Sequence, residues 1–196
     1  MSRFFAVMAR LKLIRRWSLM HNTSPENDAE HSLQVAMIAH AIALISRDRY
    51  GREINPERVC CLAVYHDATE VLTGDLPTPV KYGSDELKTA YRQVEQSASR
   101  RLLGLLPEEM RGSYQPLLNP PEGLERQIVK AADKLSAYIK CLEEQRAGSR
   151  EFDAAAENIL RALQANPLPE VHDFLRDYVP AFSMTIDELN APEAAQ

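Results

Sequence analysis

The most informative stretch of the sequence runs from Ala63 to Pro79 and reads AVYHDATEVLTGDLPTP. Its first half ends an apolar run that is typical of a buried helix, and His66 and Asp67 stand side by side within it. Burying an imidazole and a carboxylate is costly unless each group finds a partner. Because histidine nitrogen and aspartate oxygen are ordinary ligands of divalent cations, a shared metal ion is the working hypothesis for this pair.

The composition predicts a single domain over residues 1–196 with an all-α fold. A chain of 196 residues can bury a substantial core, 45% of its residues are apolar, and only 7 are glycine. No apolar run is long enough to span a membrane. The net charge of −5 and the lack of a lysine-rich stripe argue against a nucleic-acid groove. The three cysteines show neither disulfide nor zinc spacing, which favours a reduced, cytoplasmic protein.

The first 25 residues carry basic side chains but no acidic ones. Such a start can be an organelle transit peptide, or a first helix that presents arginine to an anionic ligand. The second interpretation is favoured here, because the stretch contains Trp17 and leads directly to His31, a candidate metal ligand.

Apolar periodicity together with start and stop signals predicts a chain of helices. The predicted helices cover about residues 3–15, 29–45, 56–72, 85–105, 124–146, 151–165 and 168–179. Residues 21–28 are predicted as a polar loop, and residues 107–123, which contain four prolines, as short turns. Residues 190–196 are predicted as a frayed tail.

Four residues on three of these helices form a candidate metal site: His31, His66, Asp67 and Asp133. Taken alone, His31 is also explained as a solvated residue at a helix start, and Asp133 as the partner of a neighbouring lysine. The joint pattern favours the metal, since each helix is apolar near its candidate and the ligand types are compatible.

Longer strings resemble the bacterial HD-domain 5′-deoxynucleotidase family, within the HD superfamily of metal-dependent phosphohydrolases. The resemblance covers nearly the whole chain, apart from Ser113 to Gly123 and the C-terminal tail. Four strings carry it: RLKLIRRW (Arg10 to Trp17), EHSLQVAM (Glu30 to Met37), YHDATEVLTGDLPTPVKY (Tyr65 to Tyr82) and KAADKLSAYIKCLEE (Lys130 to Glu144).

The resemblance implies an all-α HD-domain helical bundle that forms a homodimer. It implies hydrolysis of deoxyribonucleoside 5′-monophosphates to nucleoside and phosphate, by attack of a metal-bound water on phosphorus. The implied metal ligands are His31, His66, Asp67 and Asp133. The implied substrate-binding set is Arg16, Trp17, His31, Asp67, Asp75, Leu76, Pro77, Thr78 and Asp133, and the implied catalytic set is Glu70, Asp75 and Arg16.

The residue chemistry is consistent with these roles. A divalent cation lowers the pKa of a bound water from about 15.7 towards about 7. On one continuous helix, Glu70 would share a face with His66 and Asp67, so we interpret it as orienting or deprotonating that water, with a surface glutamate as the alternative. Asp75, in a stiff loop, either protonates the leaving 5′-oxygen or holds the sugar.

Arg16 suits a phosphate because its planar fork makes two parallel hydrogen bonds. For Trp17, the resemblance implies a wall beside the ribose 2′ position that favours deoxy substrates, and core packing remains the alternative. Thr78 is placed to reach the nucleotide from the loop that carries Asp75.

One divalent ion is expected as the cofactor, because no histidine lies between Ala68 and Ala132 to hold a second one. Its ligand types suit Co²⁺, Mn²⁺ or a similar ion. Two rival functions stay open: an HD hydrolase of another nucleotide, such as a triphosphate or an alarmone, and a nucleotide sensor that does not turn over. A helical interaction module without metal is a third.

Overall fold

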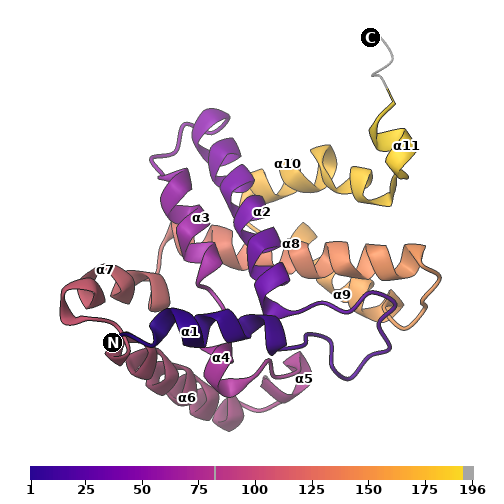
Figure 1. The fold of residues 1–196 in the computed structure, drawn as a ribbon. Coiled ribbons are helices and arrows are strands. Elements are labelled where there is room, and N and C mark those ends of the chain that lie inside the picture. Colours follow the sequence, from indigo (N-terminus) through magenta and orange to yellow (C-terminus); the bar gives the residue numbers. More distant parts are fainter. Residues whose placement is uncertain (82, 192–196) are drawn as a thin grey trace.

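The computed structural model describes residues 1–81 and 83–191, with only the backbone at residues 78 and 79, and every regular element in this part is a helix (Figure 1). The all-α prediction is therefore confirmed. None of the described helices combines the length and apolar character that crossing a membrane requires. The predicted tail from residue 190 lies almost entirely outside the described residues.

The main core lies where three helices pack together: α2 (Asp28–Asp48), α3 (Pro56–Val64) and α8 (Leu124–Arg146). Helix α2 is apolar nearly all round because α3, α8 and α10 (Pro169–Asp177) contact it on different sides. Helix α9 (Asp153–Gln164) covers α8. Residues with fully buried side chains at the centre are Val35, Ile42, Val59, Leu135 and Ile139.

Local capping fixes where two of these helices begin. The Asn27 side chain accepts hydrogen bonds from the backbone N–H groups of Ala29 and Glu30, and the Glu30 side chain returns the contact to complete a capping box. The Asn55 side chain caps α3, whose first position is Pro56, as the sequence predicts.

The predicted helix over residues 56–72 is wrong in its second half. Helix α3 ends at Val64, residues 65–69 form tight turns, and a separate short helix, α4 (Glu70–Thr73), follows. In the turns, backbone N–H groups bond three residues back instead of four, as from His66 to Ala63 at 3.3 Å. The cause is packing: Ala63 lies in the main core, whereas Ala68 is buried in a second cluster.

The second cluster packs against the turn of residues 65–69 through Ala68. It is formed largely by α1 (Phe4–Met8), α6 (Asp85–Gly104) and α7 (Glu108–Leu118), and its buried members are Phe4, Ala68, Leu102, Leu106 and Leu118. The first predicted helix is shorter than expected, since α1 continues only as a 3₁₀ helix, η1 (Ala9–Leu13).

The prediction of short turns over residues 107–123 is also wrong, because α7 forms there. Pro107 stands at the N-cap of α7 and Pro120 and Pro121 lie beyond its end, so only Pro116 lies inside the helix, which continues through it. The remaining elements are α5 (Thr78–Lys81), η2 (Val179–Ser183) and α11 (Ile186–Leu189).

Candidate active site

Two ligand candidates meet where the first turn of α2 lies against α8. The His31 ring is fully buried, and its Nε2 lies 3.1 Å from Asp133 Oδ1. The sequence alone allowed a solvated His31 and a lysine-paired Asp133. The contact between the two favours a shared site instead.

The other two candidates come from the turns between α3 and α4. His66 Nε2 lies 3.0 Å from Asp67 Oδ2 and 4.0 Å from Asp133 Oδ1, and His31 Nε2 lies 3.7 Å from Asp67 Oδ2. His31, His66 and Asp133 each place one ligand atom within 4.8 Å of the others, and Asp67 lies beside both imidazoles, so the residues come from two helices and a turn instead of three helices.

Neighbouring groups set the tautomer of both histidines. His66 donates its Nδ1–H to the carbonyl oxygen of Ala63 at 2.8 Å. Ser136 Oγ lies 3.1 Å from His31 Nδ1 and donates its own proton to Gln34, so it accepts from His31. When neutral, both rings would therefore present the Nε2 lone pair that a metal needs on the side of the carboxylates, and buried His66 Nε2 has no hydrogen-bond partner.

This donor set fits a divalent cation. Two imidazole lone pairs and two carboxylates are ligands that Zn²⁺, Co²⁺ and Mn²⁺ accept, and the outer partners of His31 and His66 hold the rings in place. Burial favours the neutral form of His66, yet Asp67 and Asp133 outweigh it and raise the pKa of His66 to about 9. The cluster therefore attracts positive charge.

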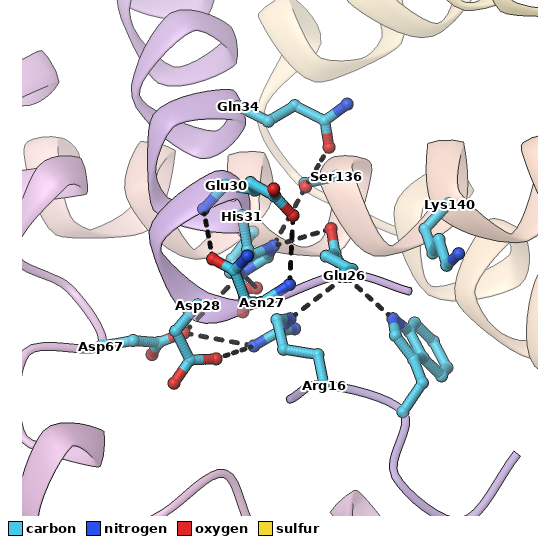
Figure 2. Close-up of polar contacts among 12 residues, drawn as sticks. Arg16, Glu26, Asn27, Asp28, Glu30, His31, Gln34, Asp67, Ser136 and Lys140 are labelled. Carbon is cyan, nitrogen blue, oxygen red and sulfur yellow. Dashed lines mark hydrogen bonds and ion pairs between the residues drawn. The ribbon is translucent and has the colours of Figure 1, made fainter. Parts of the chain in front are cut away.

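Arg16 joins the site from the segment after η1. Its Nη1 lies 3.4 Å from Asp67 Oδ2 and 3.7 Å from Asp28 Oδ1, and its Nε lies 3.3 Å from Glu26 Oε2 (Figure 2). Burial works against the charge of Arg16, but the carboxylates of Asp67, Asp133, Asp75 and Glu26 raise its pKa above the ordinary value. The guanidinium is therefore a fixed positive charge beside the metal-ligand candidates.

Three further carboxylates cluster next to Asp67: those of Asp28, Glu70 and Asp75, with one oxygen of each within 4.8 Å of the others. Glu70 is buried at the start of α4, so the alternative interpretation of Glu70 as a surface residue is wrong. The shared-face argument is also wrong, because Glu70 and His66 are not on one helix. Burial raises the pKa of Glu70, as do the neighbouring carboxylates, to about 10, and burial likewise raises the pKa of Asp75.

Sequence reasoning missed Asp28. An acid in the first turn of a helix ordinarily interacts with the helix dipole at the surface. Here the side chain is fully buried and neither carboxylate oxygen has a hydrogen-bond partner. Burial raises the pKa of Asp28 to about 7. The only signal for Asp28 in the sequence is that a charged residue begins an apolar helix.

Trp17 follows Arg16 with φ of +54°, in the left-handed region. Its ring lies 5.3 Å from the ring of Phe152, and its Nε1 donates to Glu26 at 3.1 Å. The core-packing alternative for Trp17 is therefore confirmed, and its role beside the sugar stays a prediction. Glu26 was not predicted from sequence. Leu76 and Pro77 are partly buried in the loop after α4, and the Thr78 side chain lies outside the description.

The family model described as 5′-deoxynucleotidase YfbR-like matches residues 3–182. The chain belongs to the YfbR-like 5′-deoxynucleotidase family. It is thus a hydrolase of the HD class, as the resemblance implied. A 5′-deoxynucleotidase of Vibrio parahaemolyticus is 49% identical over 191 residues, covering 96% of this chain and 98% of the relative. The 5′-deoxynucleotidase of Erwinia tasmaniensis is also 49% identical, covering 96% of each.

Solved structures confirm the HD fold of this YfbR-like chain. An HD-domain phosphohydrolase from Listeria innocua superposes with a TM-score of 0.80 at 25% identity, covering 92% of this chain and 88% of that one. A cyanophage S-2L HD phosphohydrolase, bound to dA and one catalytic Zn²⁺ ion, has a TM-score of 0.60 at 23% identity and covers 91% and 95% of the two chains.

Proposed function

We propose that this chain releases phosphate from deoxyribonucleoside 5′-monophosphates with one divalent cation held by His31, His66, Asp67 and Asp133. The observation that carries the proposal is that the Nε2 atoms of two imidazoles lie beside two carboxylates, with both Nδ1 atoms engaged elsewhere. Such a cation, when bound, supplies Lewis acidity for the phosphate and the attacking water. The cyanophage protein of the same fold holds one Zn²⁺ with dA, so the fold accommodates this combination.

Arg16 is proposed to bind and orient the phosphate. Its guanidinium is largely shielded from solvent, and it lies beside Asp67, so a phosphate near the cation comes within its reach. Two parallel N–H donors match two phosphate oxygens, and a preorganised positive charge stabilises the charge that develops on them.

Glu70 is proposed to orient or deprotonate the attacking water, and Asp75 to protonate the leaving 5′-oxygen or hold the sugar. Both side chains lie in the acidic cluster beside Asp67. The positive charge of a bound cation lowers the pKa of nearby carboxyl groups, which returns Glu70 towards the range in which it accepts a proton.

The sugar and base are proposed to lie against Trp17 and the loop of Leu76, Pro77 and Thr78. Two facts support this proposal: Trp17 directly follows Arg16 in the chain, and its indole is held against Phe152. A bulky wall there favours substrates without a 2′-hydroxyl.

Four further properties belong to the proposal. Co²⁺ or Mn²⁺ is the proposed ion, because both accept mixed imidazole and carboxylate ligands. A homodimer is supported by Leu33 and Met37, one turn apart on α2 and about 60% exposed. A single domain over residues 1–196 and a cytoplasmic location are proposed from the sequence.

The decisive assay offers the purified protein deoxyribonucleoside and ribonucleoside monophosphates, a deoxynucleoside triphosphate and an alarmone. We expect inorganic phosphate from the deoxy monophosphates and little turnover of the others. Glu70→Ala should retain metal and lose turnover. Release of pyrophosphate or triphosphate would show another nucleotide hydrolase, and binding without turnover in the wild type would show a sensor.

A further inference from the structure

A short antiparallel backbone pair closes the loop that leads into α2. Arg15 bridges Asn27, Arg16 N donates to Glu26 O at 3.1 Å, and Asp28 N donates to Ile14 O at 3.1 Å. Residues 17–25 form the loop beyond this base. Glu26 therefore lies beside Arg16 through backbone contacts alone, before its side chain is considered.

The Glu26 carboxylate contacts both substrate-binding candidates of this segment. Its Oε2 accepts from Trp17 Nε1 at 3.1 Å and lies 3.3 Å from Arg16 Nε, and its Oε1 lies 3.8 Å from His31 Nδ1. Figure 2 shows the dashed lines that join Glu26 to Arg16 and to His31. The side chain is 13% exposed, so solvent screens these contacts only weakly.

Trp17 needs external contacts to hold its conformation. A left-handed φ is unfavourable for a residue with a β-carbon and persists only where surrounding bonds enforce it. The Asn22 side-chain amide donates to the carbonyl oxygens of Trp17 and Met20, which fixes the backbone. The Glu26 bond is the hydrogen bond that fixes the indole ring itself.

We propose that Glu26 is a positioning residue that sets the geometry of Arg16 and Trp17 together. One carboxylate oxygen forms an ion pair with Arg16 at Nε, on the opposite side of the guanidinium from Nη1, which contacts Asp67. The same oxygen accepts a hydrogen bond from the indole N–H of Trp17, which fixes the plane of the ring beside the sugar. Phosphate orientation and sugar discrimination are thereby coupled through Glu26. This inference rests on the proposed function.

The loop has a second anchor that does not involve Glu26. Glu144 accepts from Thr23 N and Oγ1 at 2.9 and 2.6 Å and from Ser24 N at 3.1 Å, and Lys140 donates to Ser24 O. Because this anchor remains, a substitution of Glu26 changes the two side chains without releasing the loop.

The test compares Glu26→Gln and Glu26→Ala with a matched control, Glu151→Gln. Glu151 also contacts this loop, accepting from His21 N, but it has no contact with Arg16 or Trp17. Trp17 is the sole tryptophan, so intrinsic fluorescence and its quenching by acrylamide report on this residue alone. Kinetics with a deoxyribonucleoside and the matching ribonucleoside monophosphate, metal content and thermal stability complete the set.

For Glu26→Gln we expect kcat/KM for the deoxy substrate to fall about 10- to 100-fold, as for the loss of a charged hydrogen bond. The deoxy-to-ribo preference should shrink and quenching of Trp17 should rise, with unchanged metal content. Glu26→Ala should show larger changes, and if it fails to fold, the nearly isosteric Glu26→Gln decides. Glu151→Gln should match the wild type.

One contrary result is an active wild type together with unaltered kinetics, sugar preference and Trp17 quenching in Glu26→Gln. That result would overturn the positioning role of Glu26 but not the proposed function. Equal effects in Glu151→Gln would overturn it as well, because they would reflect a loosened loop. An inactive wild type would overturn the proposed function, and with it any substrate role of Glu26.

Discussion

His31 and Asp133 are separated by 102 positions in the chain, yet His31 Nε2 lies 3.1 Å from Asp133 Oδ1. The contact joins the first turn of α2 to α8, and the turn that carries His66 and Asp67 closes the group from a third segment. A cation held here would connect parts of the chain that are distant in sequence, so its binding is coupled to folding.

Metal removal should therefore lower thermal stability. At a free metal concentration of about 100 times Kd, binding stabilises the folded state by about 2.7 kcal/mol. In a domain of this size this corresponds to roughly 5–10 °C in Tm. Differential scanning fluorimetry with Co²⁺ and with a chelator measures the shift. Asp67→Asn should lose the response together with nearly all activity, and a response equal to that of the wild type would place the ion elsewhere.

Ser136→Ala should weaken metal binding without removing a ligand. Ser136 accepts the Nδ1–H of His31, and loss of such an outer partner costs about 10- to 100-fold in metal affinity or activity. Titrating the chelated protein with Co²⁺ while following activity gives the affinity. Ser46→Ala is the matched control, since Ser46 is a buried serine of α2 that donates to Glu170. Equal affinities in both variants would contradict the orienting role.

Arg16→Ala should keep the metal but reduce kcat/KM about 10- to 150-fold, the loss of a charged hydrogen bond to phosphate. Metal affinity should not fall, because the substitution removes a positive charge beside Asp67. Arg15→Ala is the control, since Arg15 is adjacent in sequence but exposed. Steady-state kinetics and elemental analysis of the three proteins check this, and unchanged kinetics in Arg16→Ala would remove Arg16 from the site.

Glu144 should make stability depend on acid pH. Burial opposes its ionisation, but hydrogen bonds from Lys140, Thr23 and Ser24 outweigh burial and lower the pKa of Glu144 to about 2. Its contribution is complete above its ordinary pKa near 4.5 and is lost as the pH falls towards 2. Glu144→Gln should destabilise by about 2–3 kcal/mol at pH 7, and the difference from wild type should shrink at pH 3.

Urea unfolding of both proteins at the two pH values measures that difference in unfolding free energy. The control is Glu143→Gln, at an exposed position next to Glu144 on α8. A difference between wild type and Glu144→Gln that is the same at pH 7 and pH 3 would exclude ionisation of Glu144 as its cause.

The helices that sequence predicts well are those whose ends are set by local chemistry. Asn55 and Pro56 begin α3, and Ser84 caps α6, in each case through contacts within a few residues. The break after Val64 is not local. It depends on Ala63 and Ala68 packing into two separate clusters, which apolar spacing along one helix does not reveal.

The site divides in the same way. Residue types and the family resemblance indicated the four metal-ligand candidates, which the fold brings together. Glu26 and Asp28 escaped prediction because their environment arises only when residues 14–28 fold back on themselves and α2 packs against its neighbours. A carboxylate in a polar loop or a first helical turn looks solvated until its neighbours are known.

A crystal structure of the Glu70→Ala variant with Co²⁺ and a deoxyribonucleoside 5′-monophosphate would test the proposed metal site most directly. We predict one cobalt ion at about 2.0–2.2 Å from His31 Nε2, His66 Nε2 and the carboxylates of Asp67 and Asp133, with the phosphate between the ion and Arg16. A cobalt ion bound by other residues, or a phosphate bound away from the ion, would contradict the proposed site.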